Sequence, residues 1–306
     1  MVVTAATEYT SPGERADREP SNTNPRLTNH RTRVPYATNG DARIYYETHG
    51  AAYADDDVDA VALCGELGYG PWQWGWQHAA LAGPYELVVP ATRGTGDPDA
   101  DARSDAPPGP WSAADLAADL EAVLADAGVD SAHLVGVGLG GCVALTAALD
   151  PAVSSRVADL ALVGTAASGG ALAPDALWAD PDDADEAEAS LAAALSADFL
   201  ADQPDVAERI ADWRAAEDAD RESWEAARAA LDGVDLSDRL YEVTNPALVL
   251  HGSTDAVCPP ERGRALAEGL PRGRFEPVVG AGHLANVDDA PTVNDRLLAF
   301  FGTDRE

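Results

Sequence analysis

The chain has 306 residues, of which 53 are acidic and 20 are basic, so its formal net charge at neutral pH is −33. It contains no lysine, so every basic residue other than histidine is arginine. Such a charge balance argues against nucleic acid or an anionic membrane surface as a partner. We expect a small-molecule ligand or substrate instead, and the sequence leaves the oligomeric state open.

The same composition indicates adaptation to high salt. Carboxylates keep the surface hydrated, and their repulsion is tolerable where the Debye length is short, about 3 Å at 1 M salt. An ordinary acidic protein is the alternative, but it does not explain the absence of lysine. Cys64, Cys142 and Cys258 are widely spaced and form no metal-type pair. With no signal-peptide pattern and no membrane-length apolar run, we expect a high-salt cytoplasm, no cofactor and no metal.

In chain order, residues 1–33 are polar and without periodicity, which predicts a disordered tail. Two alternating runs, 34–38 and 42–47, are joined by Asn39-Gly40-Asp41 and predict a hairpin. Buried strands and amphipathic helices then alternate. We expect strands at 58–63, 86–90, 132–137, 159–165, 246–252 and 274–279, and helices at 72–81, 111–127, 139–149, 262–270 and 291–301.

This β-α alternation predicts an α/β fold with a doubly wound, mostly parallel sheet. Residues 168–240 interrupt the rhythm, because they are rich in Ala, Asp and Glu, helical in period and free of strand candidates. We therefore expect a core of residues 34–167 and 241–306, with residues 168–240 inserted as a helical cap over one end of the sheet.

A glycine-rich turn joins the buried run Ala132–Val137 to the following helix. Its Gly136-x-Gly138-x-Gly140 spacing resembles the nucleophile elbow of α/β-hydrolases, in which G-x-S-x-G places a serine on a strained strand-to-helix turn. With Gly141, the same glycines also match the dinucleotide-binding pattern G-x-G-x-x-G. That alternative expects an acidic residue at the end of the next strand, and none stands there. A close-packed turn without chemistry is the third possibility.

From about residue 34 to 301 the order of elements is similar to that of the α/β-hydrolase superfamily, most of all its enol-lactone hydrolase and non-haem haloperoxidase branch. The run 248–255, which ends in Asp255, resembles the strand and turn that deliver the catalytic acid of the family. The turn Gly280-Ala281-Gly282-His283 resembles the one that delivers its catalytic base. The resemblance therefore implies that Asp255 orients His283 for proton transfer.

Three departures from the family pattern bear on activity. Gly138 stands at the nucleophile position, so no acyl-enzyme can form there. The usual His-Gly after the strand at 58–63 is replaced by Cys64-Gly65-Glu66. The resemblance assigns the oxyanion-hole donors to the backbone N–H groups of Leu139 and Glu66, and the Glu66 carboxylate is unhelpful there unless it points away. The Asp of the D-x-R-G-x-G turn is Ala91 here.

Two hypotheses of different kinds follow. In the first, the protein is an enzyme in which His283, oriented by Asp255, acts as general base on a small, largely apolar substrate without a covalent step. In the second, it is a pseudoenzyme that binds a small ligand. Cys142 lies a full turn into the helix and is not expected to replace the nucleophile.

The charge of the chain predicts that its fold depends on salt. Lowering KCl from about 3 M to 0.1 M lengthens the Debye length from about 2 Å to 10 Å and leaves the carboxylates unscreened. We expect the melting temperature to fall across this series when it is followed by circular dichroism. A melting temperature that stays constant would contradict the proposed salt adaptation.

Overall fold

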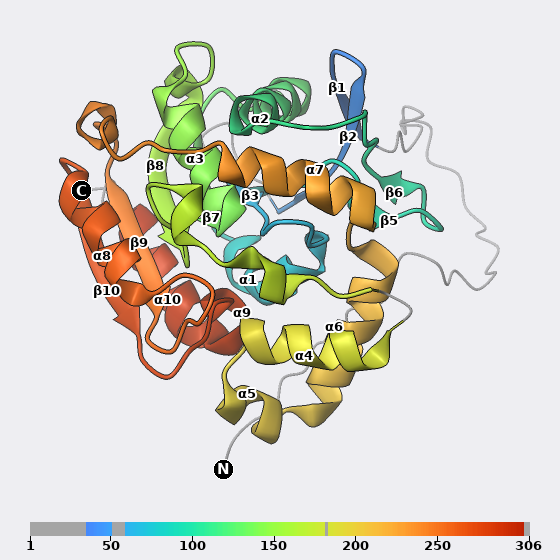
Figure 1. Cartoon of the computed structure of the whole chain (residues 1–306). Coiled ribbons are helices and arrows are strands. Elements are labelled where there is room, and N and C mark those ends of the chain that lie inside the picture. Colours follow the sequence, from blue (N-terminus) through green and yellow to red (C-terminus); the bar gives the residue numbers. More distant parts are fainter. Residues whose placement is uncertain (1–34, 51–58, 181–182, 303–306) are drawn as a thin grey trace, which may run out of the picture.

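The computed structural model describes residues 35–50, 59–180 and 183–302. It confirms the predicted α/β-hydrolase architecture, a mostly parallel eight-stranded sheet covered by helices on both faces (Figure 1). The strand order is β1-β2-β4-β3-β7-β8-β9-β10. The tail predicted at residues 1–33 lies outside the described residues.

The sheet opens with the predicted hairpin, because β1 pairs antiparallel with β2, and β2 pairs antiparallel with β4. From β4 to β10 all neighbouring strands run parallel. The strands are β1 (Tyr36–Asn39), β2 (Ala42–His49), β3 (Ala60–Cys64), β4 (Glu86–Pro90), β7 (Ala132–Val137), β8 (Val157–Val163), β9 (Ala247–Gly252) and β10 (Gly273–Val278).

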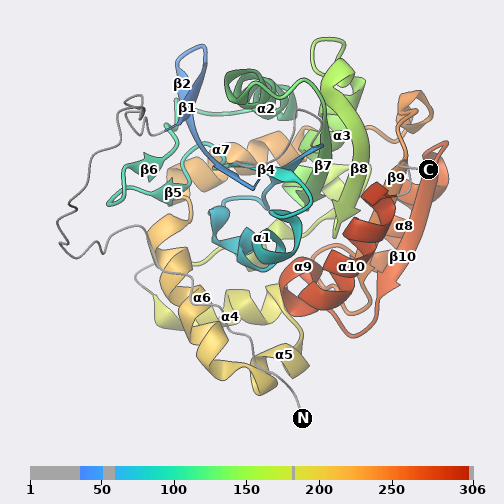
Figure 2. The ribbon, with the colours of Figure 1, turned by 180° about the vertical axis from the view of Figure 1, so that it is seen from behind.

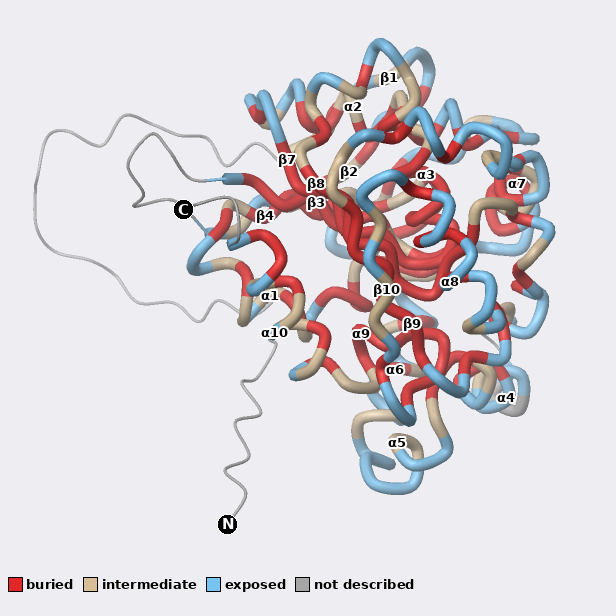
Figure 3. Tube along the Cα trace, turned by 90° about the vertical axis from the view of Figure 1, so that its left-hand side faces the viewer, coloured by how far each residue is buried: buried red, intermediate tan, exposed pale blue. Residues whose placement is uncertain are grey.

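Central strands β3, β7 and β9 are buried along their whole length, which explains their uninterrupted apolar sequences (Figure 3). Alternate side chains point to two separate cores, one on each face of the sheet. Helices α2 (Ala113–Ala127), α3 (Leu139–Leu149) and α8 (Pro260–Gly269) cover one face. Helices α1 (Gly75–Leu81) and α10 (Ala290–Phe301) cover the other (Figure 2).

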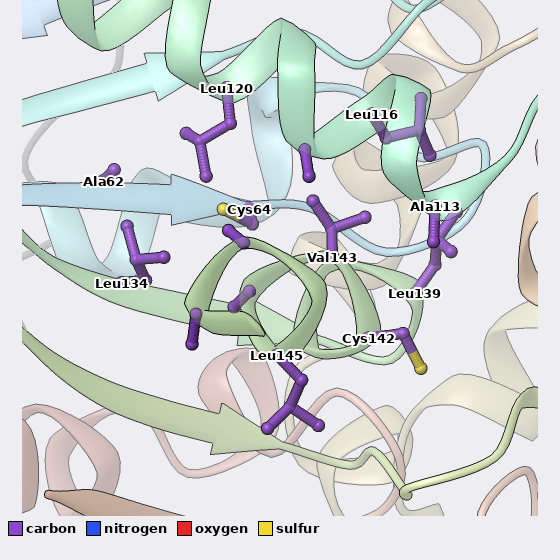
Figure 4. Close-up of a cluster of buried hydrophobic side chains, with 14 of the residues drawn as sticks. Ala62, Cys64, Ala113, Leu116, Leu120, Leu134, Leu139, Cys142, Val143 and Leu145 are labelled. Atoms are coloured by element: carbon purple, nitrogen blue, oxygen red, sulfur yellow. The ribbon is translucent and has the colours of Figure 1, made fainter. Parts of the chain in front are cut away.

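Helix α2 shows how local sequence sets these boundaries. The Ser112 hydroxyl accepts from the backbone N–H of Asp115, whose carboxylate accepts from the backbone N–H of Ser112, so a capping box starts the helix. Gly128 ends it in the left-handed region, at φ 75°. Leu116 and Leu120 then pack against Val143 of α3 above the end of β3 (Figure 4). This packing fixes α3, and with it the glycine turn that precedes α3.

Between β8 and β9 the described residues form helices and no ladder strand, as the sequence predicted. We call residues 168–240 the cap segment, with the boundaries proposed from the sequence. It contains η3 (Gly169–Ala171), η4 (Pro174–Leu177), α4 (Ala184–Ala194), α5 (Ala197–Asp202), α6 (Pro204–Glu217), α7 (Arg221–Asp232) and the start of η5 (Leu240–Glu242). Helices α4, α5 and α6 gather at one end of the molecule in both ribbon views (Figures 1 and 2).

Contacts of the cap segment place it over the carboxyl ends of the parallel strands. The backbone N–H of Ala173 donates to the carbonyl of Val257 after β9, and that of Leu284, after β10, donates to the carbonyl of Ala194. Some small elements were not predicted. A two-residue pairing of β5 (Gly96–Asp97) with β6 (Ala102–Arg103) lies in the Pro/Asp-rich loop. The short helix α9 (Ala285–Asp288) follows His283.

None of the helices in the described part of the chain is long and apolar enough to cross a membrane.

Candidate active site

Four parallel strands bring the predicted site residues to one edge of the sheet. Glu66 follows β3, Gly138 follows β7, Asp255 follows β9 and His283 follows β10. In the parallel register Cys64 of β3 pairs with Gly136 of β7. The loops that leave these two strands therefore lie side by side. Carboxyl ends of parallel strands are where α/β sheets place their ligand sites.

The turn after β7 has the strained geometry expected of an elbow. Gly138 has φ 48° and ψ −110°, a conformation that costs a non-glycine residue about 1–3 kcal/mol. The residues two positions before and after it are glycines for steric reasons: a Cβ on Gly136 would lie 2.4 Å from the carbonyl oxygen of Gly140, and a Cβ on Gly140 would lie 2.0 Å from the carbonyl oxygen of Cys64. The strained turn is therefore formed with glycine at position 138. The dinucleotide alternative gains no support, because β8 ends at Val163 and Gly164 without a carboxylate.

The Glu66 carboxylate fills the space that a nucleophile would need. A Cβ placed on Gly138 would lie 1.5 Å from Oε2 and 2.3 Å from Cδ of Glu66. Oε1 of Glu66 accepts hydrogen bonds from the backbone N–H groups of Leu67 at 2.5 Å and Leu139 at 3.2 Å. Those two donors converge as an oxyanion hole does, and here they hold a resident carboxylate.

His283 lies between two carboxylates. Its Nε2 is 2.6 Å from Oε2 of Glu66, and its Nδ1 is 2.9 Å from Oδ2 of Asp255. The other oxygen of Asp255, Oδ1, accepts from the backbone N–H groups of Val257 and Cys258, both at 2.8 Å. The structure thus brings together the predicted pair Asp255 and His283, and adds the Glu66 side chain as a third member.

These contacts fix the charge of His283. Burial disfavours the charged imidazole, but Asp255 and Glu66 outweigh it and raise the pKa of His283 to about 10. Burial likewise opposes ionisation of Asp255, yet the charge of His283 and the hydrogen bonds that Asp255 accepts hold its pKa well below the usual range. At neutral pH the centre is therefore an imidazolium between two acceptors, and its Nε2 already carries a proton.

One oxyanion-hole residue differs from the sequence prediction. The backbone N–H of Glu66 does not face the site, because it donates to Oε1 of Gln73 at 2.9 Å. Leu67, one residue later, supplies the donor instead, beside the predicted donor Leu139. Gln73 holds the loop in this orientation by donating in turn to the carbonyl of Gly70 at 2.9 Å. The Glu66 side chain consequently turns inward, where the sequence left its direction open.

The centre is closed to solvent. The side chains of Glu66, His283 and Asp255 have no exposed surface. A cavity of about 40 Å³ lies beside the end of β3, but Cys64, Gly65 and Leu139 are among its lining residues and the three centre residues are not. It has room for about one or two water molecules and not for a substrate.

Three other groups bear on the chemistry of the site, and of these His251 contacts the centre through Asp255. Cys142 is buried with Sγ 3.6 Å from Oγ1 of Thr165, and burial raises the pKa of its thiol to about 12, so it is no nucleophile at neutral pH. Burial raises the pKa of Cys64 to about 12 as well. His251 was not predicted: its Nε2 lies 2.7 Å from the carbonyl of Cys258 and 3.2 Å from Oδ2 of Asp255. Among the described residues, no group of three or more His, Cys, Asp or Glu side chains could hold a metal ion.

Comparison with known proteins agrees with the fold. A family model described as the alpha/beta hydrolase fold matches residues 80–290. The chain is 30% identical, over 282 residues, to RutD of Azorhizobium caulinodans, which carries the name of a carbamate hydrolase. The alignment covers 88% of this chain and 98% of that protein.

Solved structures give the same picture. The enol-lactonase from Burkholderia xenovorans LB400 matches with a TM-score of 0.75 and 26% identity, over 88% of this chain and 100% of that one. A hydrolase from Pseudomonas aeruginosa PA01 matches with a TM-score of 0.76 and 26% identity, over 89% of this chain and 100% of that one.

Replacing Glu66→Gln should lower the pKa of His283, because it removes one of the two carboxylates that stabilise the buried imidazolium. We expect the imidazole to titrate at least about one pH unit below the wild type. NMR of the His283 ring nitrogens across pH 5–11 measures this. Glu261→Gln, at an exposed position in the first turn of α8, is the control and should leave the titration unchanged. A wild-type His283 that titrates near 6.5 would contradict the ion pair.

Proposed function

The chain belongs to the α/β-hydrolase family, and we propose that it is a non-catalytic member whose hydrolytic centre is closed by Glu66, leaving it to bind a small ligand. The observation that carries the proposal is the position of the Glu66 carboxylate. It occupies the space of the nucleophile, takes both oxyanion-hole donors and engages Nε2 of His283. Each of these groups is needed for acyl transfer, and none is free.

The alternative hypothesis, general-base catalysis by His283, has less support. A general base needs an unprotonated nitrogen within reach of the proton that it abstracts. Here Nε2 faces Glu66 at 2.6 Å, and the pKa of His283 is raised to about 10 by its carboxylate partners against the effect of burial. Enzymes tune a base towards the working pH, whereas these contacts move His283 away from it.

The hydrolysis named for the relatives therefore does not carry over. We infer that the chain lacks the carbamate hydrolase activity named for RutD and the lactonase activity named for the Burkholderia protein. What supports a retained binding role is the fold itself, with a cap segment packed over the strand ends; the 40 Å³ cavity beside β3 is too small to be the place where the ligand binds. The acidic, lysine-free composition further supports a high-salt cytoplasm as the place where it works.

Restoring the nucleophile tests the closed centre. Gly138→Ser alone should give no labelling by a small fluorophosphonate, because a side chain at 138 collides with Glu66. Gly138→Ser combined with Glu66→Gly removes the collision and frees Nε2 of His283 and both backbone donors. We expect this double variant to be labelled at the introduced serine, read by intact mass and peptide mapping, with the positive φ at 138 costing about 1–3 kcal/mol of stability.

The matched control adds His283→Ala to the double variant and should abolish labelling, because the serine then lacks its base. The wild type should stay unlabelled. Labelling of the wild type would refute the proposal by revealing an active nucleophile. A folded double variant that stays inert would instead show that the rest of the centre no longer supports acyl transfer.

A further inference from the structure

The cap segment is joined to the loop that carries Glu66 by hydrogen bonds to two adjacent carboxylates. The backbone N–H of Trp72 donates to Oε2 of Glu217 at 2.8 Å. The backbone N–H of Gly70 and Nε1 of Trp72 donate to Oδ1 of Asp218, at 3.0 Å and 2.8 Å. The backbone N–H of Ala219 completes the joint by donating to the carbonyl of Gly68 at 2.8 Å.

The two carboxylates are not equally compensated. Nε of Arg214 donates to Oδ2 of Asp218 at 2.7 Å, while the rest of this buried guanidinium bonds Ser190 and the carbonyl of Leu177. Among the described residues Glu217 forms no ion pair, and its carboxylate accepts one hydrogen bond, from the backbone N–H of Trp72. The ionised form of Glu217 is therefore unfavourable in free energy, because its carboxylate is half-buried, has no cation partner and lies next to the charged Asp218.

The surroundings of Glu217 add negative charge. Asp218 follows Glu217 directly at the end of α6, and Arg214 of the same helix binds Asp218. Strand β2 contributes the charge of Glu47, and β5 contributes that of Asp97. The guanidinium of Arg103 on β6 donates to the carbonyls of Gly96 and Asp218. Burial, followed by the charges of Asp218, Glu47 and Asp97, raises the pKa of Glu217 to about 7 against the bond from Trp72. Burial also raises the pKa of Asp218, with Arg214 first among the groups that oppose it.

We propose that Glu217 is a proton-controlled latch: protonated, it holds the end of α6 in the cap segment against residues 68–74, and ionised, it loosens that joint. The coupling is short, because Glu66 lies four residues before Gly70 and its carbonyl accepts from the backbone N–H of Tyr69 at 3.1 Å. Tyr69 also lies under Arg214, whose guanidinium is 4.3 Å from the ring centroid. Loosening this joint therefore also frees the loop that carries Glu66.

Linkage gives the direction and size of the effect. An acid whose pKa is raised in the closed state binds its proton more tightly there than in the open state, where the ordinary value is 4.5. The closed state is therefore favoured at low pH and loses ground between pH 4.5 and about 7. The opening constant should rise by up to about tenfold per pH unit in that interval and level off above it.

Hydrogen exchange of the whole chain tests the latch, at constant high KCl between pH 5.5 and 8.5 and after correction for intrinsic exchange. We expect protection of peptides spanning residues 68–76 and 204–219 to fall about tenfold per unit up to pH 7 and then level off. A peptide that contains β7 is the internal reference and should not change.

Two variants separate the latch from other carboxylates. Glu217→Gln keeps the shape but not the titration, so it should flatten the profile and leave the joint more protected than the wild type at pH 8. Asp212→Asn, on the same helix but away from the joint, should behave as the wild type does. A flat wild-type profile, or a Glu217→Gln variant that retains the wild-type slope, would overturn the latch. If Glu217→Gln does not fold, the wild-type profile decides alone. The closed-centre proposal is independent of either result.

Discussion

The contact between the Glu66 carboxylate and the His283 imidazole determines the rest of this centre. It requires glycine at position 138, because any Cβ there would overlap Oε2 of Glu66. It requires the loop after β3 to direct the Glu66 side chain inward. Gln73 holds the loop in this orientation by accepting a hydrogen bond from the backbone N–H of Glu66. It also sets the protonation of His283. Gly138 and the inward-facing side chain of Glu66 therefore depend on each other in this structure.

Most of the fold follows from the sequence because its signals are local and strong. Buried strands such as β7 and β9 are short apolar runs, and the capping box at Ser112 marks the start of α2. The pairing of β5 with β6 was missed because two-residue strands carry no periodicity. The domain boundaries at 168 and 240 stay predictions.

The site was predictable only as far as backbone motifs reach. Asp255 and His283 stand in turns that follow parallel strands, so the sequence motifs predict where their side chains lie. In the structure Oδ2 of Asp255 is 2.9 Å from Nδ1 of His283. The direction of the Glu66 side chain depends on the rotation of a loop, and therefore on Gln73, a residue that no motif marks. The same rotation moves the oxyanion-hole donor from Glu66 to Leu67. The hydrogen bond from Glu66 to Gln73 thus sets the direction of the Glu66 side chain, which the spacing of sequence motifs could not predict.

The network around His283 explains how this buried charged centre is held in one arrangement. Each carboxylate accepts two backbone hydrogen bonds and one from the imidazolium. The backbone donors are the N–H groups of Leu67, Leu139, Val257 and Cys258. Removing one partner of such a buried set leaves an uncompensated charge, at a cost of about 3–5 kcal/mol. The donors that would stabilise a transient oxyanion in a hydrolase stabilise the Glu66 carboxylate here, so the elbow and the loop after β3 are joined by contacts that also stabilise the fold.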